Sequence, residues 1–171
     1  MHINIQTNLS FIALLAIEKE AEHDQFRVYL KQMNSDELDE MIFPIQEEVT
    51  AAIDCTSCGA CCKSLMINVT DEEASQLSST LGINESQFRQ QYLEESMEGQ
   101  LIINQVPCHF LEGSKCSIYQ NRFIECREFP HLHKKGFQNR LFGTLMHYGT
   151  CPIVFNSIEA LKTVSGFHAS L

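Results

Sequence analysis

The sequence contains no apolar run long enough to cross a membrane. The longest such run near the N-terminus covers residues 11–17, whereas a membrane-spanning helix needs roughly 20 apolar residues. No cationic segment precedes this run, and Glu18-Lys19-Glu20 follows it where a signal peptide would carry small residues before its cleavage site. We therefore expect the run to lie in the protein core. We also expect the protein to make no contact with a membrane and to be located in the cytoplasm.

Cations are scarce, because 12 Lys and Arg residues stand against 22 Asp and Glu residues and give a formal net charge of −10. Non-specific affinity for nucleic acid comes from cations that neutralise phosphates, so we expect no nucleic-acid partner. The sequence also lacks a glycine-rich phosphate loop, a nucleophile elbow and a Ser/His/Asp arrangement. It therefore contains no motif on which an enzymatic activity could be assigned.

The first 54 residues contain no cysteine and have the apolar spacing of helices. The apolar residues that recur at intervals of three and four are Phe11, Leu14, Leu15, Phe26, Tyr29, Leu30 and Met33. Asn34, with Glu37 three residues later, predicts the start of another helix, and Pro44 predicts a kink or a restart within it. We expect residues 1–54 to form a helical extension packed on a cysteine-rich domain, residues 54–171, within one globular unit.

Capping signals predict three more helices in the rest of the chain. The residue pairs that mark their starts are Thr70 with Glu73, Asn84 with Gln87, and Asn156 with Glu159. Gly82 suits the left-handed end of the first of these helices. Short β-prone runs at residues 101–103 and 117–119 flank a turn signal at residues 112–114 and predict a hairpin. The predicted fold is mainly α with a small β-hairpin, an irregular α+β fold organised around a cysteine-rich metal site.

The eight cysteines are the strongest functional signal in the chain. Because thiols stay reduced in the cytosol, such a pattern indicates a metal site or catalysis more often than disulfides. Half of these cysteines lie within residues 55–62, which favours coordination. The predicted metal ligands are Cys55, Cys58, Cys61, Cys62, Cys108, Cys116, Cys126 and Cys151.

Cys55 and Cys58 form the clearest ligand pair. Two intervening residues let the backbone turn until both sulfurs meet one ion, and Gly59 suits a position with positive φ. Neighbouring side chains point apart, so Cys61 and Cys62 do not easily bind the same ion. A helix would place Cys62 beside Cys58, whereas a turn would favour Cys61. The cysteine left over would serve a second metal ion or act as a small buried apolar residue.

Eight thiols allow one or two tetrahedral zinc ions, since each ion takes four ligands. The C-x2-C-x2-C spacing from Cys55 to Cys61 also matches part of an iron–sulfur motif whose last cysteine precedes proline, as Cys151 precedes Pro152. Cys151 lies much farther along the chain than that motif requires. Zinc is therefore the first prediction, and iron or an iron–sulfur cluster is the alternative. A thiol–disulfide exchange site is the weakest interpretation, because no βαβ pattern surrounds Cys55 and Cys58.

Basic residues gather among the later cysteines, and they are Lys115, Arg122, Arg127, Lys134, Lys135 and Arg140. They would offset the negative charge of a metal–thiolate centre, or bind an anionic substrate or partner. Arg127 is the expected hydrogen-bond donor near the cluster because it follows Cys126. The histidines weighed as further zinc ligands are His109, His131, His133 and His147, although eight thiols make this need small.

The run from Cys55 to Cys62 resembles the CxxCxxCC family of zinc- or iron-chelating cysteine-cluster proteins. Residues 107–119, 126–130 and 151–156 resemble the later blocks of that family in the same order, so the resemblance covers about residues 54–162. Arg122-Phe123 departs from the Arg-Pro that is usual there, which affects the local backbone rather than the ligands. The resemblance implies metal binding, with a metal ion as the partner. We expect the site to have a structural or metal-handling role. A related pattern in proteins similar to flagellin lysine N-methylase implies the alternative, an iron–sulfur redox protein or enzyme.

Overall fold

The computed structural model describes residues 3–169, apart from the side chain of Ser57. The chain forms two compact units, which we call unit 1 (residues 1–54 and 130–171) and unit 2 (residues 55–129). The structure is mostly helical with small antiparallel sheets, which confirms the predicted α+β class. No helix in the described part of the chain is long and apolar enough to cross a membrane.

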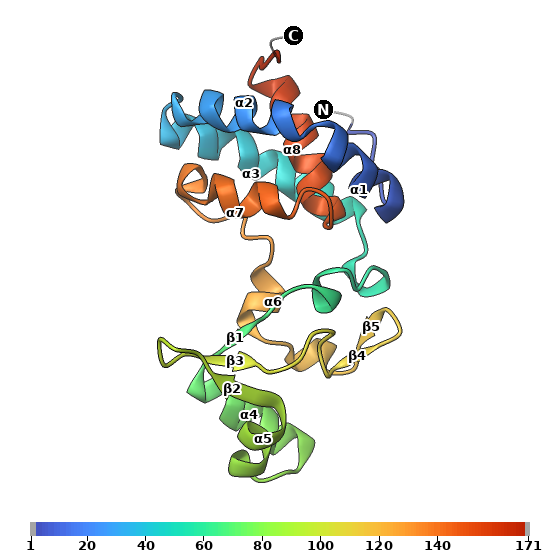
Figure 1. The fold of residues 1–171 in the computed structure, drawn as a ribbon, viewed down its shortest axis with the longest axis vertical. Helices are drawn as coiled ribbons and strands as arrows, with labels where there is room; N and C mark the ends of the chain where they lie inside the picture. The colour runs from blue at the N-terminus through green and yellow to red at the C-terminus, as the bar shows by residue number, and fades with distance from the viewer. Residues whose placement is uncertain (1–2, 170–171) are drawn as a thin grey trace. The chain divides into compact units, whose positions relative to one another are not determined.

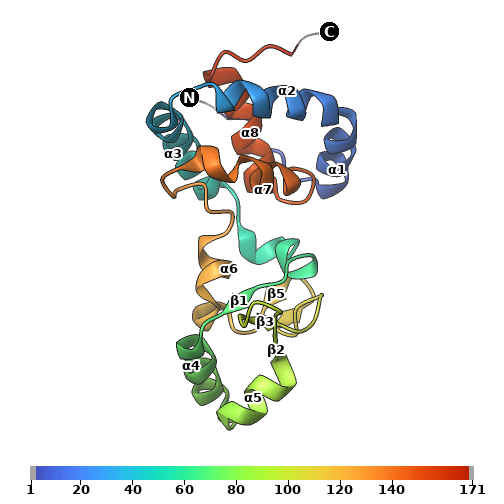
Figure 2. The same cartoon turned by 60° about the vertical axis from the view of Figure 1, so that its left-hand side comes forward.

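Unit 1 is built from helices (Figure 1). In chain order they are α1 (Leu9–Glu18), α2 (Glu20–Lys31), α3 (Ser35–Ala52), the 3-10 helix η4 (Phe137–Arg140), α7 (Leu141–Met146) and α8 (Pro152–Val164). Figures 1 and 2 both show α8 running through the middle of these helices. Ten of its 13 residues are buried, so α8 forms the centre of the unit 1 core.

Residues up to 54 form three helices, and the predicted start at Asn34 is confirmed. The Asn34 side chain accepts hydrogen bonds from the backbone N–H groups of Asp36 and Glu37. The expected restart at Pro44 is wrong, because α3 continues through it as one helix. Proline removes a single N–H donor there, and the burial of Ile42 and Ile45 on either side supports the helix through tertiary packing.

Asp39 connects α3 to the segment that precedes α7. Its carboxylate is buried and accepts hydrogen bonds from the backbone N–H groups of Gly136, at 2.7 Å, and Phe137, at 2.9 Å. Gly136 has a φ of 72°, so the turn uses the conformational freedom of glycine. Two segments that are far apart in sequence are therefore held together by one charge-assisted contact.

A second polar network lies between α2 and α8. The ammonium group of Lys162 donates to Glu22, at 2.6 Å, and to Glu159, at 2.7 Å, and only 8% of its side chain is exposed. The Tyr148 hydroxyl donates to the same Glu159 carboxylate at 2.9 Å. The His23 ring packs edge-on against Tyr148, with 4.0 Å between ring centroids. Each buried charge in this network has an opposite charge beside it, as burial requires.

Two expectations for unit 1 are wrong. The apolar run at residues 11–17 forms helix α1, but Ile12 is its only buried residue, whereas Leu14 and Ile17 are 53% and 75% exposed. The last helix begins at Pro152 rather than after Asn156, because proline needs no hydrogen-bond acceptor at the first helical position. Asn156 instead lies buried inside α8, where it exchanges two hydrogen bonds with the backbone of Gln6.

Unit 2 contains short elements on both sides of two small sheets (Figure 2). In chain order they are η1 (Cys55–Ser57), η2 (Cys61–Lys63), β1 (Asn68–Val69), α4 (Asp71–Leu81), α5 (Glu85–Tyr92), β2 (Leu93–Glu95), β3 (Leu101–Ile103), β4 (Leu111–Glu112), β5 (Lys115–Cys116), η3 (Tyr119–Asn121) and α6 (Ile124–Glu128). Its core contains ten buried apolar side chains, including Phe88, Phe110 and Phe123.

The predicted capping signals of α4 and α5 are confirmed. Thr70 and Glu73 form a reciprocal capping box, and Gly82 ends α4 in the left-handed conformation. Asn84 accepts from the backbone N–H of Ser86 at the start of α5. The two helices contact each other and contribute Ala74, Leu77 and Phe88 to the apolar core of unit 2.

The predicted hairpin forms, but from different strands. Its strands are β4 and β5, in which Leu111 pairs with Cys116 and Glu112 with Lys115. Residues 101–103 instead form β3, the central strand of a separate sheet with the order β1-β3-β2. Residues 117–119 form no strand. A strand forms only where a partner strand lies at the correct register. The two-residue turn at Gly113 brings only the residues on either side of it, 111–112 and 115–116, into register with each other.

Candidate metal centre

The segment from Cys55 to Ser64 forms two consecutive tight turns rather than a regular helix. The N–H of Cys58 donates to the carbonyl of Cys55 at 3.3 Å, and the N–H of Ser64 donates to the carbonyl of Cys61 at 3.1 Å. Gly59 joins the two turns with a φ of 63°, which confirms the predicted positive φ. Of the two backbone alternatives considered for Cys61 and Cys62, the segment therefore adopts the turn, which is the one that favours Cys61, and not the helix.

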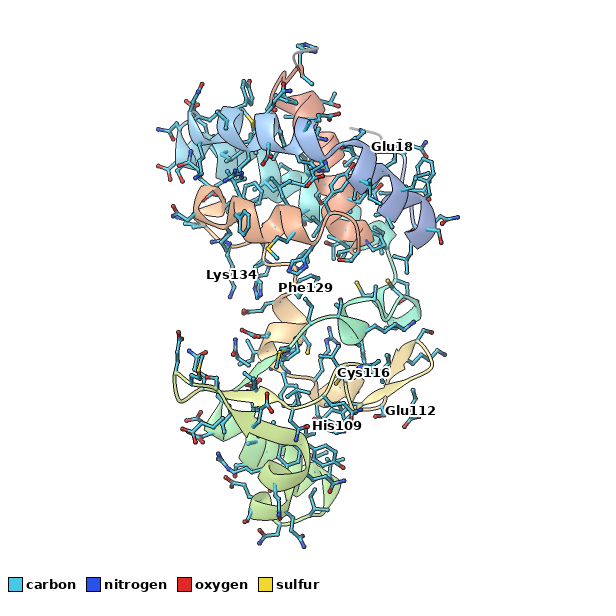
Figure 3. All side chains as sticks on the ribbon, viewed as in Figure 1. Glu18, His109, Glu112, Cys116, Phe129 and Lys134 are labelled. Carbon is cyan, nitrogen blue, oxygen red and sulfur yellow. The ribbon has the colours of Figure 1, made fainter. Side chains whose placement is uncertain are left out.

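The cysteine loop is attached to the segments that carry Cys108 and Cys116. The N–H of Cys108 donates to the carbonyl oxygen of Cys62 at 2.8 Å, so the two backbones are in direct contact. Strand β5, which ends at Cys116, packs beside η1. Figure 3 shows Cys116 where the hairpin meets this loop. Residues more than 40 positions apart are thereby brought to one place.

Cys126 lies on α6, and the preceding residue fixes that helix to the sheet. The Glu125 carboxylate accepts from the backbone N–H of Asn68 at 2.9 Å and from its side-chain amide at 2.8 Å. The thiols of Cys108, Cys116 and Cys126 all pack against the unit 2 core. Three ligand candidates from three separate segments therefore share one apolar surface.

The pKa values show that four of these thiols influence one another. Burial raises the pKa of Cys126 to about 12, with further contributions from the charges of Cys62, Cys108 and Cys116. Burial also raises the pKa of Cys108 and of Cys116, and the charge of Cys62 adds to both shifts. Cys62 is thus electrostatically coupled to the other three thiols.

The thiol of Cys62 is additionally coupled to Cys61. A side-chain hydrogen bond with Cys61 is the largest cause that raises the pKa of Cys62, and burial is the second. Without a cation, the coupled thiols therefore remain protonated near neutral pH. A divalent ion reverses this preference, since several thiolates can form only where a positive charge compensates them.

Two cations act on the cluster: the charge of Lys63 lowers the pKa of Cys62, and Arg122 acts on two of the other thiols. The charge of Arg122 lowers the pKa of Cys116 and of Cys126, although the other contributions outweigh it. The guanidinium lies 3.8 Å from the centre of the Tyr119 ring and donates to the Tyr119 carbonyl at 3.1 Å. The sequence predicted Arg127 as the hydrogen-bond donor near the cluster because it follows Cys126. Arg122, one of the basic residues expected to offset the charge of the cluster, is brought near it by the turn η3.

Two other basic residues of the group serve different purposes. Arg140 donates to the backbone carbonyl oxygens of Lys135 and Gly136, at 2.9 and 3.3 Å, and thereby stabilises the loop before η4 in unit 1. Lys115 forms a backbone pair with Glu112 in the hairpin. Lys115, Arg122 and Arg127 belong to unit 2, whereas Lys134, Lys135 and Arg140 belong to unit 1.

The histidines weighed as ligands are placed differently from the coupled thiols. His109 is in unit 2, where its Nε2 lies 2.6 Å from Asn104 Oδ1 and its ring packs edge-on against Tyr92. An Nε2 that donates to Asn104 carries a proton and cannot coordinate a metal through that nitrogen. His131, His133 and His147 belong to unit 1.

Cys151 also belongs to unit 1, where it is the residue before α8 and packs against the unit 1 core. The other seven predicted ligands are in unit 2. None of the eight cysteines takes part in a disulfide bond in the structure. Cys55 is exposed, and the remaining seven are partly buried.

The chemistry of this donor set fits zinc or iron, which prefer thiolate ligands. Its geometry is more open than that of a bound site. Within residues 3–169, no group of three or more His, Cys, Asp or Glu side chains is arranged to hold a metal ion. The coupled thiols therefore do not converge on one point in the described residues.

A cluster of reduced thiols on short turns and a hairpin defines a cysteine-rich metal-chelating domain as the class of protein. Residues 54–145, more than half of the chain, match the CxxCxxCC family, described as a "putative zinc- or iron-chelating domain". The chain therefore belongs to this family. The match extends beyond unit 2 into the η4 and α7 region of unit 1, and it ends before Cys151. Neither a curated protein nor a solved structure matches the chain.

Proposed function

We propose that unit 2 chelates one zinc ion through the thiolates of Cys62, Cys108, Cys116 and Cys126. The observation that carries this proposal is the coupling of the Cys62 thiol to three thiols from separate segments. Four thiolates are the number that a closed tetrahedral zinc site requires. The contact between the backbones of Cys62 and Cys108 limits how far the ligands must move to converge.

The site has a structural role in this proposal. Unit 2 extends only from Cys55 to Phe129, and its core contains ten buried apolar side chains. Domains of this size often need a metal or disulfides, because the conformational entropy lost on folding nearly cancels the gain from a small core. A zinc ion would bind the cysteine loop, the hairpin and α6 to one another and supply the missing stability.

The remaining cysteines of the loop form the second part of the proposal. Cys55 and Cys58 lie at the two ends of a tight turn, and Cys61 follows. Cys55 is exposed, whereas Cys58 and Cys61 are partly buried. We assign these three to an outer site that exchanges its ion more easily, because it lacks a fourth ligand in unit 2. Cys151 remains a predicted ligand from unit 1. Both sites require reduced thiols and hence a reducing compartment such as the cytoplasm.

Elemental analysis tests the identity of the metal. The full chain is purified without chelator and without oxygen, and zinc, iron and acid-labile sulfide are counted per chain. One or two zinc ions without sulfide would support the proposal. Iron with matching sulfide, and absorption near 400 nm, would contradict it in favour of the iron–sulfur alternative, since zinc has a filled d shell and gives no colour.

Single Cys→Ser variants test which thiols bind the inner ion. Cys62→Ser and Cys126→Ser should lose the more tightly held zinc, measured by competition with a chromophoric chelator. Cys55→Ser and Cys58→Ser should retain it and lose only the weakly held ion. Cys151→Ser tests the remaining predicted ligand in unit 1. Retention of the tightly held zinc by Cys62→Ser would disprove the assignment of the inner site.

A further inference from the structure

Unit 2 contains more cysteines than one tetrahedral zinc ion can use, since such an ion takes four ligands. The surplus thiols of the outer site, Cys55, Cys58 and Cys61, all precede Cys62 in one loop. Cys55 is exposed, whereas the coupled thiols of the hairpin region and α6 pack against the unit 2 core. An ion that arrives from solvent therefore reaches the outer site before the inner site, which is formed by Cys62 and the three thiols coupled to it.

The outer and inner sites are in contact at two consecutive residues. Neighbouring side chains usually point apart, yet the thiols of Cys61 and Cys62 form a hydrogen bond with each other. Both residues lie on η2, where the N–H groups of Ser64 and Leu65 donate to the carbonyl of Cys61 at 3.1 and 2.9 Å. One thiol of the outer site thus contacts one thiol of the inner site.

The two ends of the cysteine loop lie against segments that carry inner ligands. Turn η1, which begins at Cys55, packs beside β5, which ends at Cys116. At the other end of the loop, the carbonyl of Cys62 accepts from the N–H of Cys108 at 2.8 Å. The loop is therefore attached at both ends, and the step from Cys61 to Cys62 needs no movement of the backbone between the two sites.

We propose that Cys61 is an exchange ligand, through which a zinc ion captured at the outer site passes to the inner site. This inference rests on the proposed function, because it requires both sites. Zinc has a filled d shell without a preferred geometry and can take a fifth ligand in passing, so thiolates can replace one another one at a time. The contact between Cys61 and Cys62 provides the first replacement.

The transfer moves protons and involves no oxidation or reduction. The bond from zinc to the Cys62 sulfur forms as the bond to the Cys61 sulfur breaks, and the Cys62 proton crosses the hydrogen bond to Cys61. The other three inner thiols then displace Cys55 and Cys58 and fill the fourth position that the outer site leaves open. Two of their protons return to Cys55 and Cys58, and the third goes to solvent. The outer thiols can then capture another ion.

Isotope exchange in the full, zinc-loaded chain tests the proposal, with an enriched zinc isotope as the probe and mass spectrometry as the readout. The wild type should exchange its outer ion in a fast phase and its inner ion in a slow phase. Cys61→Ser should retain the inner ion but slow its exchange roughly tenfold or more, because the barrier rises when the bridging ligand is lost.

Ser64→Ala is the matched control for Cys61→Ser. The Ser64 hydroxyl donates to the carbonyl of Ala60 at 3.1 Å in the same turn, so this variant loosens the turn and removes no thiol. Its slow phase should keep the wild-type rate. A slow phase retarded as much in Ser64→Ala as in Cys61→Ser would overturn the proposal, because the shape of the turn would then explain the effect.

A double variant tests whether capture and transfer lie on one path. Cys55→Ser should also slow the exchange of the inner ion, and Cys55→Ser combined with Cys61→Ser should be no slower than the slower single variant. Slowing by the product of the two factors would indicate independent effects and overturn the single path.

The outcomes separate this inference from the proposed function on which it rests. If Cys61→Ser exchanges its inner ion as fast as the wild type or faster, the inference alone is overturned. If Cys61→Ser loses the tightly held ion, Cys61 is a permanent ligand and the inference is overturned as well. A wild-type chain that holds no zinc would overturn the proposed function and this inference together.

Discussion

A β-carbon built on Gly59 would lie 2.8 Å from the carbonyl oxygen of Ser114, closer than two such atoms can approach. The bend after Cys58 thus rests directly on the turn of the β4–β5 hairpin. The contact fixes the distance between the cysteine loop and Cys116. The glycine in the C-x-x-C-G sequence therefore serves packing as well as backbone conformation.

Gly59→Ala should destabilise unit 2 by about 2–4 kcal/mol, because alanine is strained at a φ of 63° and its β-carbon meets backbone atoms that cannot rotate away. Gly113→Ala is the matched control. Gly113 has a similar φ of 67°, but a β-carbon there meets nothing within 4 Å, so we expect a loss of only about 1 kcal/mol. Urea unfolding of the metal-loaded variants measures both, and equal losses would contradict the steric explanation.

Removal of the metal should unfold unit 2 and spare unit 1. Structural zinc contributes on the order of 10 kcal/mol in zinc-finger peptides, more than a small core can replace. Hydrogen exchange followed by mass spectrometry should therefore show loss of protection throughout residues 55–129 after chelation. Peptides from α8, which has its own large core, should remain protected. Unchanged protection of unit 2 would show that the ion is not structural.

Unit 1 should lose stability between pH 6.5 and pH 4 through His23. Burial lowers the pKa of His23 from 6.5 to about 4, so the folded state resists protonation while the unfolded state accepts it. The stabilising contribution is complete above pH 6.5 and is lost as the pH falls towards 4, with an upper limit of roughly 3 kcal/mol. Titration of the imidazole by NMR measures the pKa directly.

His23→Phe provides the control for this acid effect, because it keeps a ring beside Tyr148 and removes the titrating nitrogen. The Nε2 atom of His23 is buried without a hydrogen-bond partner in the described residues. Replacing the ring by phenylalanine therefore breaks no hydrogen bond at this atom. In urea unfolding, the wild type should lose more stability than the variant between pH 7 and pH 4.5. Parallel losses would place the acid sensitivity elsewhere.

Lys162→Met should destabilise unit 1 by about 2–4 kcal/mol. The substitution removes the ammonium group that bonds to Glu22 and Glu159. These partly buried carboxylates then have less positive charge beside them to offset their own. The hydrogen bonds from Lys162 and Lys19 outweigh the effect of burial and keep the pKa of Glu159 low, so this pKa should rise in the variant. Lys31→Met, at an exposed position of α2, should change the unfolding free energy by less than about 0.5 kcal/mol.

Several local elements were predictable because their causes lie within a few residues. The capping signals at Asn34, Thr70 and Asn84 each start a helix where the sequence predicts one. Gly59 adopts the positive φ expected after the C-x-x-C pair. Side-chain capping and backbone sterics act over one helical turn, so neighbouring residues are sufficient to specify them.

Pairing and exposure were harder to predict because they depend on distant residues. The run at residues 101–103 has strand character, yet only the fold decides that it pairs with β1 and β2 rather than within the hairpin. The outward side of α1 is as apolar as a core helix, and no local signal reveals that Leu14 and Ile17 remain exposed. Burial is a property of the assembled helices, not of a short segment.

The sequence by itself determined the chemistry of this protein: a group of reduced thiols whose spacing and family membership indicate zinc or iron chelation. The tertiary structure decided which thiols influence one another electrostatically. It couples Cys62 with Cys108, Cys116 and Cys126, places Cys151 in the other unit, and brings Arg122 rather than Arg127 to act on the cluster. Ligand type follows from the residues alone, whereas proximity follows from turns and strand pairs that join segments far apart in the chain.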